Sequence, residues 1–199
     1  MAKCSTVGGG TPQSVTIDDL VKDYIEKRKK VFDTDLKRCS DINEVFNHPH
    51  QYRIAKVAKE QAEKKLKADK LWNRKYSSFE EVYDAVNKSI GSIRGIGKLA
   101  VYDVALRLGS TQEIHPQDRI YLSSDAKKGF NNLLKKILKI GVDVALENLI
   151  EVLLKKSAIV LTAELLKYLW KYFPALKKLL PMYLEDFLCI FDDKLMNIK

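Results

Sequence analysis

The chain has 199 residues, and its 35 Lys and Arg against 26 Asp and Glu give a formal net charge of +9 at pH 7. This length suits one domain with a buried core, and the positive charge favours polyanions as partners. No stretch approaches the roughly 18 apolar residues of a spanning helix, and the N-terminus lacks a basic start followed by an apolar run. We therefore expect neither a membrane-spanning nor a secreted protein.

The cysteine and histidine residues do not form a recognisable metal or disulfide pattern. Cys4, Cys39 and Cys189 are odd in number and far apart, which favours a reducing compartment, so we expect a cytoplasmic protein. His48 and His50 flank a proline without a carboxylate or cysteine cluster at ligand spacing, so a loop is the better interpretation than a zinc site. The sequence predicts no metal site and no organic cofactor.

Glycine and proline are rare, and apolar residues recur at three- and four-residue spacing almost throughout. The sequence therefore predicts an all-α fold, a helical bundle in which residues 16–199 form one domain. We divide the chain by composition into a flexible tail, basic N-terminal helices, a central pair of helices joined by a tight link, and an apolar C-terminal bundle, at residues 1–15, 16–76, 77–125 and 126–199.

Two basic helices are expected before the central pair. The first begins after Thr16, a good N-cap, and fades into the basic run 27–30. The second, 51–70, has a narrow apolar stripe and a strongly basic outer face. That face is either a solvated surface or a surface that follows a phosphate backbone, and the latter interpretation uses five lysines, Lys56, Lys59, Lys64, Lys65 and Lys67.

The central pair has clear boundaries. Ser78 followed by Glu81 is a capping-box pattern that starts a helix running to Gly91, and a second apolar-periodic run extends from Lys98 to Gly109. The link between them, Ser-Ile-Arg-Gly-Ile-Gly at 92–97, allows a sharp turn, because glycine tolerates conformations that other residues avoid. The exposed N–H groups of this link and of the following helix start favour a phosphate oxygen, directly or through a bound cation.

This link and the helix after it resemble the helix-hairpin-helix motif of DNA repair and replication proteins, over about 30 residues. The resemblance implies that Gly95, Ile96 and Gly97 contact DNA phosphate, with Arg94 and Lys98 as charged neighbours. It also implies that a monovalent cation can sit at the hairpin. The chain departs from the motif four positions after the second glycine, where the usual small residue is replaced by valine.

Two other functions stay open beside sequence-nonspecific DNA binding. Helix-hairpin-helix glycosylases place a catalytic Asp about twenty residues after the hairpin, which corresponds to Asp118 here, so a DNA-processing enzyme is the second hypothesis. Leu99 stands where some of those enzymes carry a lysine nucleophile, which disfavours a Schiff-base mechanism. The third hypothesis is a structural or protein-interaction protein in which the link only joins two packed helices.

Overall fold

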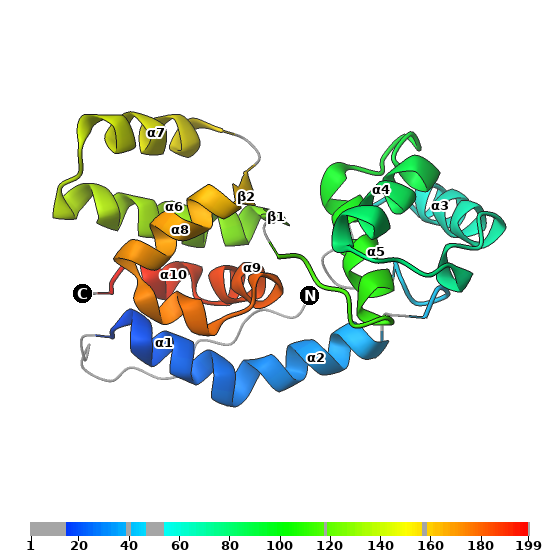
Figure 1. The fold of residues 1–199 in the computed structure, drawn as a ribbon, viewed down its shortest axis with the longest axis horizontal. Coiled ribbons are helices and arrows are strands. Elements are labelled where there is room, and N and C mark those ends of the chain that lie inside the picture. Colours follow the sequence, from blue (N-terminus) through cyan, green and yellow to red (C-terminus); the bar gives the residue numbers. More distant parts are fainter. Residues whose placement is uncertain (1–14, 39–40, 47–53, 118, 157–158, 199) are drawn as a thin grey trace.

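The computed structural model describes residues 15–38, 41–46, 54–117, 119–156 and 159–198. The described chain is mostly helical, so the predicted all-α class is confirmed. Two groups of helices lie side by side, and the first long helix runs along both of them (Figure 1). In chain order the helices are α1 (Ile17–Asp23), η1 (Tyr24–Arg28), α2 (Lys29–Arg38), α3 (Lys56–Ala68), η3 (Leu71–Asn73), α4 (Phe79–Ile90), α5 (Lys98–Ser110), α6 (Ser124–Ile140), α7 (Val144–Lys155), α8 (Ala163–Tyr172), η4 (Pro174–Lys178), α9 (Pro181–Ile190) and α10 (Asp192–Leu195).

The first helix begins as predicted but is longer than predicted. Thr16 and Asp19 form a reciprocal capping box at its start. It does not end in the basic run 27–30, because the single π-helical turn η1 carries the helix directly into α2. The extra residue of a π turn rotates the apolar face of the helix, and Ile25 is 41% exposed. The ion pair between Lys29 and Asp33, at 3.0 Å, faces α9, because the Tyr183 hydroxyl donates a 2.8 Å hydrogen bond to Asp33.

The smaller group of helices contains α3, α4 and α5. Ser78 accepts a hydrogen bond from the Glu81 N–H at 3.2 Å and so caps α4 as predicted. The helix α3 packs against α4 through a narrow stripe of buried residues, Ala58, Ala62 and Leu66. Val57, next to Ala58 in the chain, lies outside that stripe and is 64% exposed.

The larger group is built on α6. This helix crosses α9 so closely that a Cβ on Gly129 would lie 2.2 Å from the Leu188 carbonyl oxygen. It ends at Gly141, where φ is +88°, and Asp143 caps the next helix, α7. The N-terminal helix α1 packs here against η4, while α2 packs against α5 in the smaller group.

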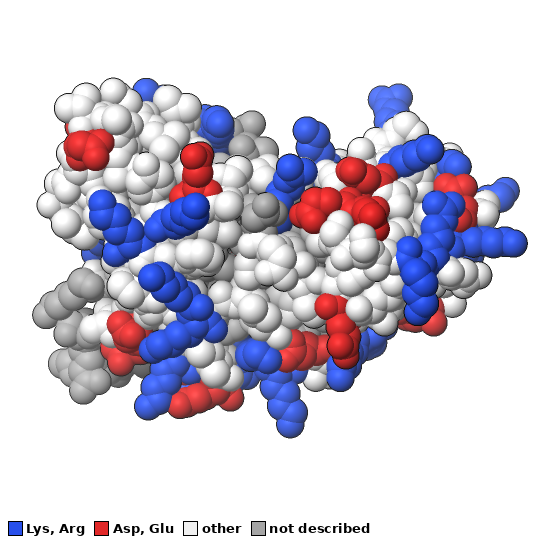
Figure 2. All heavy atoms as spheres, viewed as in Figure 1, with Lys and Arg blue, Asp and Glu red and all other residues white. Residues whose placement is uncertain are grey.

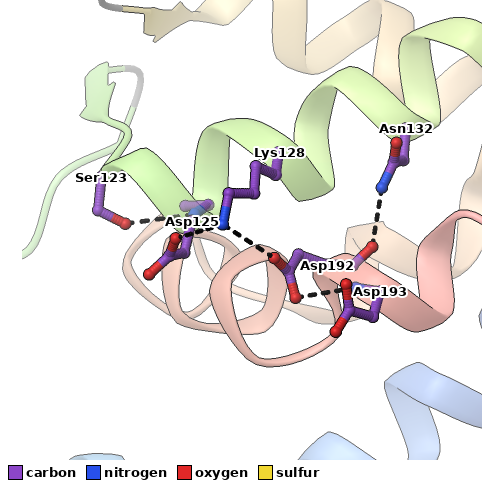
Figure 3. A network of polar contacts seen from close by, with 7 residues as sticks. Ser123, Asp125, Lys128, Asn132, Asp192 and Asp193 are labelled. Carbon is purple, nitrogen blue, oxygen red and sulfur yellow. Dashed lines mark hydrogen bonds and ion pairs between the residues drawn. The ribbon is translucent and has the colours of Figure 1, made fainter.

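A network of polar contacts joins α6 to α10 (Figure 3). Lys128 on α6 lies 2.9 Å from Asp125 and 4.0 Å from Asp192, and Asn132 donates a 2.8 Å hydrogen bond to the Asp192 carbonyl. Partial burial raises the pKa of the Asp192 carboxyl, and Lys128 opposes that shift. This network fixes the chain's C-terminal helix against the middle of the bundle.

Two short strands lie outside the sequence prediction. β1 (Arg119–Tyr121) pairs antiparallel with β2 (Val160–Thr162), with Ile120 opposite Leu161. Both of these residues are fully buried. The pair closes the junction between the two groups of helices, because β1 packs against both α5 and α9.

Candidate nucleic-acid interface

The link between α4 and α5 is a compact double turn. After α4 ends, the Ile93 N–H donates to the Ile90 carbonyl at 3.0 Å, and the Ile96 N–H donates to the Ile93 carbonyl at the same distance. These bonds reverse the chain within seven residues, so that α4 and α5 pack on each other. We call residues 91–97 the hairpin.

The predicted contact residues lie together on the hairpin and at the start of α5. Ile96 points inward, is 7% exposed and belongs to the hydrophobic core between the helices. Arg94, Gly95, Gly97 and Lys98 are all exposed. Ile96 therefore anchors the hairpin in the core, against which the partly buried Ile93 also packs. The predicted glycine and cation positions are exposed.

Gly95 has a structural reason to be glycine. Its φ of +97° lies in the region that L side chains rarely adopt. A Cβ added there would lie 3.5 Å from the Cβ of Ala58, an ordinary van der Waals distance. The contact also shows that the hairpin rests on α3, which brings this loop and the basic helix together.

Gly97 has no comparable reason to be glycine. Its φ of −93° and ψ of 171° are extended values that any residue adopts, and a Cβ at this position would meet nothing within 4 Å. Neither the turn nor the packing of the described chain calls for glycine here. A glycine without a conformational role is suited to a close approach of the backbone by something outside the chain.

The N-terminus of α5 is electropositive. Gly97 is its N-cap and supplies no side-chain hydrogen bond, and the first turn contains no acidic residue. The first N–H groups of a helix have no partner within the helix, and they form the positive end of its dipole. Lys98 adds a cation at the first helical position, where a positive charge is unfavourable unless an anion is present. Five helices of the described chain are capped by side chains, at Thr16, Ser78, Ser123, Asp143 and Thr162, whereas α3 and α9, like α5, are not.

The basic face of α3 is less uniform than the sequence indicates. Lys59 donates to the Phe46 carbonyl at 3.1 Å, Lys65 pairs with Asp69 at 3.1 Å, and Lys67 donates to Asn43 at 2.7 Å. The other two lysines, Lys56 and Lys64, are exposed and less constrained. Lys56 lies 3.8 Å from Glu60, and Lys64 makes no hydrogen bond or ion pair with the described residues. In Figure 2 this group of helices shows Lys and Arg side chains at its outer end and acidic side chains closer to the other group.

The position of α3 under the hairpin could not be read from the helical pattern alone. The signal that was available is the pair of alanines on its stripe, Ala58 and Ala62, because small residues let another backbone approach a helix closely. The sequence predicted a basic face on this helix and two charged neighbours, Arg94 and Lys98, at the hairpin, and it left their spatial relation open. The structure places them in contact.

The candidate enzymatic residue, Asp118, lies outside the described residues, as do His48 and His50. Within the described part of the chain, no group of three or more His, Cys, Asp or Glu side chains is placed to hold a metal ion.

Among the described residues, no helix combines the length and apolar character needed to cross a bilayer. We find no family model, curated protein or solved structure that matches this chain.

Proposed function

We propose that this protein binds DNA through its phosphate backbone, using the hairpin and the start of α5, without sequence preference. The observation that carries the proposal is Gly97, an exposed glycine that neither the backbone conformation nor the packing requires. A phosphate oxygen hydrogen-bonded to backbone N–H groups at a helix start needs such an open approach. Contacts of this kind read the backbone and not the base edges, so they carry no sequence information.

Electrostatics supports the same assignment. Arg94 and Lys98 flank the open end of α5, and the contact between Gly95 and Ala58 sets α3, with exposed Lys56 and Lys64, beside them. The net charge of +9 adds long-range attraction for a polyanion. Each lysine or arginine that neutralises a phosphate releases condensed counterions, so binding of this kind weakens steeply as salt is raised.

The test is a salt titration of binding to short duplex and single-stranded DNA, followed by fluorescence anisotropy. The double variant Arg94→Ala, Lys98→Ala is compared with the wild type and with Lys135→Ala, Lys139→Ala, which removes the same charge from exposed positions of α6 in the other group of helices. We expect the logarithmic salt slope to fall by about 2 in the hairpin variant and to stay near the wild-type value in the control. Equal losses in the two variants, or no binding of the wild type at low salt, would overturn the proposal.

A bound monovalent cation is part of the same proposal. Replacing sodium with a bulky tetraalkylammonium ion at constant ionic strength removes a cation that fits between carbonyl oxygens and leaves screening unchanged. Weaker binding after this exchange supports cation-mediated contact at the hairpin, whereas unchanged binding indicates direct contact of phosphate with N–H groups.

A further inference from the structure

A second site candidate lies at the junction of the two groups of helices, away from the hairpin. It is a cavity of about 220 Å³ whose walls come from the first long helix, from α5 and from α9. Junctions of this kind are frequent places for small-molecule sites, and this volume suits a ligand smaller than a typical drug. The π turn η1 ends at the cavity wall with Arg28, and π turns inside α-helices are frequent at functional sites.

The cavity is acidic within a basic protein. Four carboxylates and two arginines, Arg28 and Arg107, line it, and Arg38 from outside the lining pairs with one of these carboxylates, Asp35, at 3.2 Å. One negative charge is therefore in excess around the cavity. The carboxylates belong to Asp35, Asp103, Glu185 and Asp186. A cleft lined mainly by one sign of charge with apolar walls concentrates ions of the opposite sign. The cavity therefore favours a cation, although the chain as a whole favours anions.

Tyr102 on α5 gives an independent sign of a ligand. Its side chain lines the cavity, the residue is 2% exposed, and its hydroxyl has no hydrogen-bond partner among the described residues. An unpaired buried hydroxyl is costly, and native proteins satisfy nearly all such groups. Burial raises the pKa of this phenol, and the negative charges of Glu185 and Asp103 raise it further, which places the hydroxyl in the negative field of the cavity.

A metal ion does not fit this arrangement. Within the described ranges, no three acidic, histidine or cysteine side chains converge as metal ligands. The carboxylates are instead spread over separate helices around the cavity. Asp186 accepts a 2.9 Å hydrogen bond from the Tyr24 hydroxyl, and Glu185 accepts one from the Ser123 N–H at 3.3 Å. A carboxylate has about four lone-pair sites, so such a bond leaves it able to accept from a ligand as well.

The apolar part of the wall suits the carbon chain of an organic cation. Phe32 and Met182 line the cavity beside the acidic groups, and the Phe32 ring is held edge-on against Tyr183 at a centroid distance of 5.5 Å. Aromatic faces attract ammonium groups, and thioether and methylene groups pack against alkyl chains. Separated carboxylates and an apolar middle together match a molecule with a positive charge at each end.

We propose that this cavity binds a small aliphatic diamine. One ammonium group lies between the carboxylates of α5 and α9 and donates a hydrogen bond to the Tyr102 hydroxyl oxygen, and the other lies near Asp35. Arg107 is held in the wall of the cavity by the 2.8 Å hydrogen bond from its Nη1 to the Asp103 carbonyl. This inference does not depend on DNA binding.

Isothermal titration calorimetry with putrescine tests the proposal on the full chain. Butanediol, which has the same length without charge, and magnesium chloride, a compact divalent cation, serve as control ligands. We expect heat of binding from putrescine alone. Equal binding of magnesium, or no saturable binding of putrescine, overturns the proposal.

Two variants locate the site. Tyr102→Phe removes only the hydroxyl and keeps the ring, so we expect putrescine to bind about tenfold more weakly, the loss for one hydrogen bond of this type, while the melting temperature is unchanged or higher. Asp35→Asn removes one cavity charge and should also weaken binding. Its matched control is Asp23→Asn on the same long helix, which pairs with Lys27, lies outside the cavity and should bind as the wild type does. A lower melting temperature of Tyr102→Phe with unchanged affinity, or equal losses in Asp35→Asn and Asp23→Asn, contradicts the assignment.

Discussion

Two of the three glycines of the hairpin, Gly95 and Gly97, make a matched pair of variants that separates folding from binding. Gly95 has a φ of +97°, whereas Gly97 has a φ of −93° and open space around the position of a Cβ. Replacing each glycine with alanine adds the same methyl group to the same exposed loop. The backbone conformation of the unbound protein therefore sets the difference in stability between the two variants. The role of Gly97 shows only in DNA binding.

For Gly95→Ala, the cost is backbone strain, because the added Cβ would lie at an ordinary 3.5 Å from Ala58. Strain of this kind costs roughly 1–3 kcal/mol of unfolding free energy. For Gly97→Ala, the alanine reduces the entropy of the unfolded chain but is a poorer N-cap than glycine, so the net change is about 1 kcal/mol or less in either direction.

DNA affinity, in contrast to stability, should depend on Gly97. A methyl group on Gly97 stands where a phosphate would approach the N–H groups of α5. Loss of one charge-assisted hydrogen bond costs about 2 kcal/mol, or roughly a thirtyfold loss of DNA affinity. Gly97→Ala is therefore expected to keep its stability and lose its binding.

Urea denaturation followed by circular dichroism gives the stability, and anisotropy of labelled duplex DNA gives the affinity. Ser92→Ala, at an exposed position of the same hairpin, is the control and should behave as the wild type in both assays. If Gly97→Ala binds DNA with wild-type affinity and wild-type stability, the reasoning from this glycine is refuted. A loss of several kcal/mol of stability in Gly97→Ala would instead refute the described geometry of the loop.

Three further changes test the fold. Gly129→Ala puts a methyl group 2.2 Å from the Leu188 carbonyl, and the forced separation of α6 and α9 should cost roughly 1–3 kcal/mol in urea denaturation; an unchanged midpoint would contradict this crossing. Ser78→Ala removes the hydroxyl that accepts a hydrogen bond from the Glu81 N–H and should lower the free energy of unfolding by about 1 kcal/mol. Ser92→Ala, at a serine that caps no helix, is the control. Burial lowers the pKa of His115, so the unfolded chain takes up its proton first as pH falls. The contribution of neutral His115 to stability should therefore be full above about pH 6.5 and should be lost as the pH falls toward the lowered pKa. The variant His115→Gln should lose less stability over this pH range than the wild type, as measured by urea denaturation.

The hairpin shows how far local sequence can specify a candidate site. Glycine spacing, the apolar residue between the glycines and the helix start after them are all local features, and the structure has the Ile96 anchor inside and the charged and glycine positions outside. The support from α3 is not local, because Ala58 is far from Gly95 in the chain. That contact depends on how three helices pack, which the separate periodicities of those helices do not encode.

Some helix boundaries are likewise set by local residues, and others are set by packing. Thr16 with Asp19, Ser78 with Glu81, and the break at Gly141 are stop and start signals carried by adjacent residues, and they hold in the structure. The continuation of the first helix through its basic run depends on the contacts that α1 makes with η4 and that α2 makes with α5. Packing along the length of a helix outweighs the weak local preference to end it.

The sequence by itself determined the helical class, the caps and the exposed glycine-rich turn, because helix periodicity and turn chemistry act over a few neighbouring residues. Only the tertiary structure decided three other features: the pairing of β1 with β2, the support of the hairpin by α3, and the acidic cavity around Tyr102. Each of these joins segments that are distant in the chain. Such contacts form only when many helices pack together, and their energy depends on shape and burial that no local pattern records.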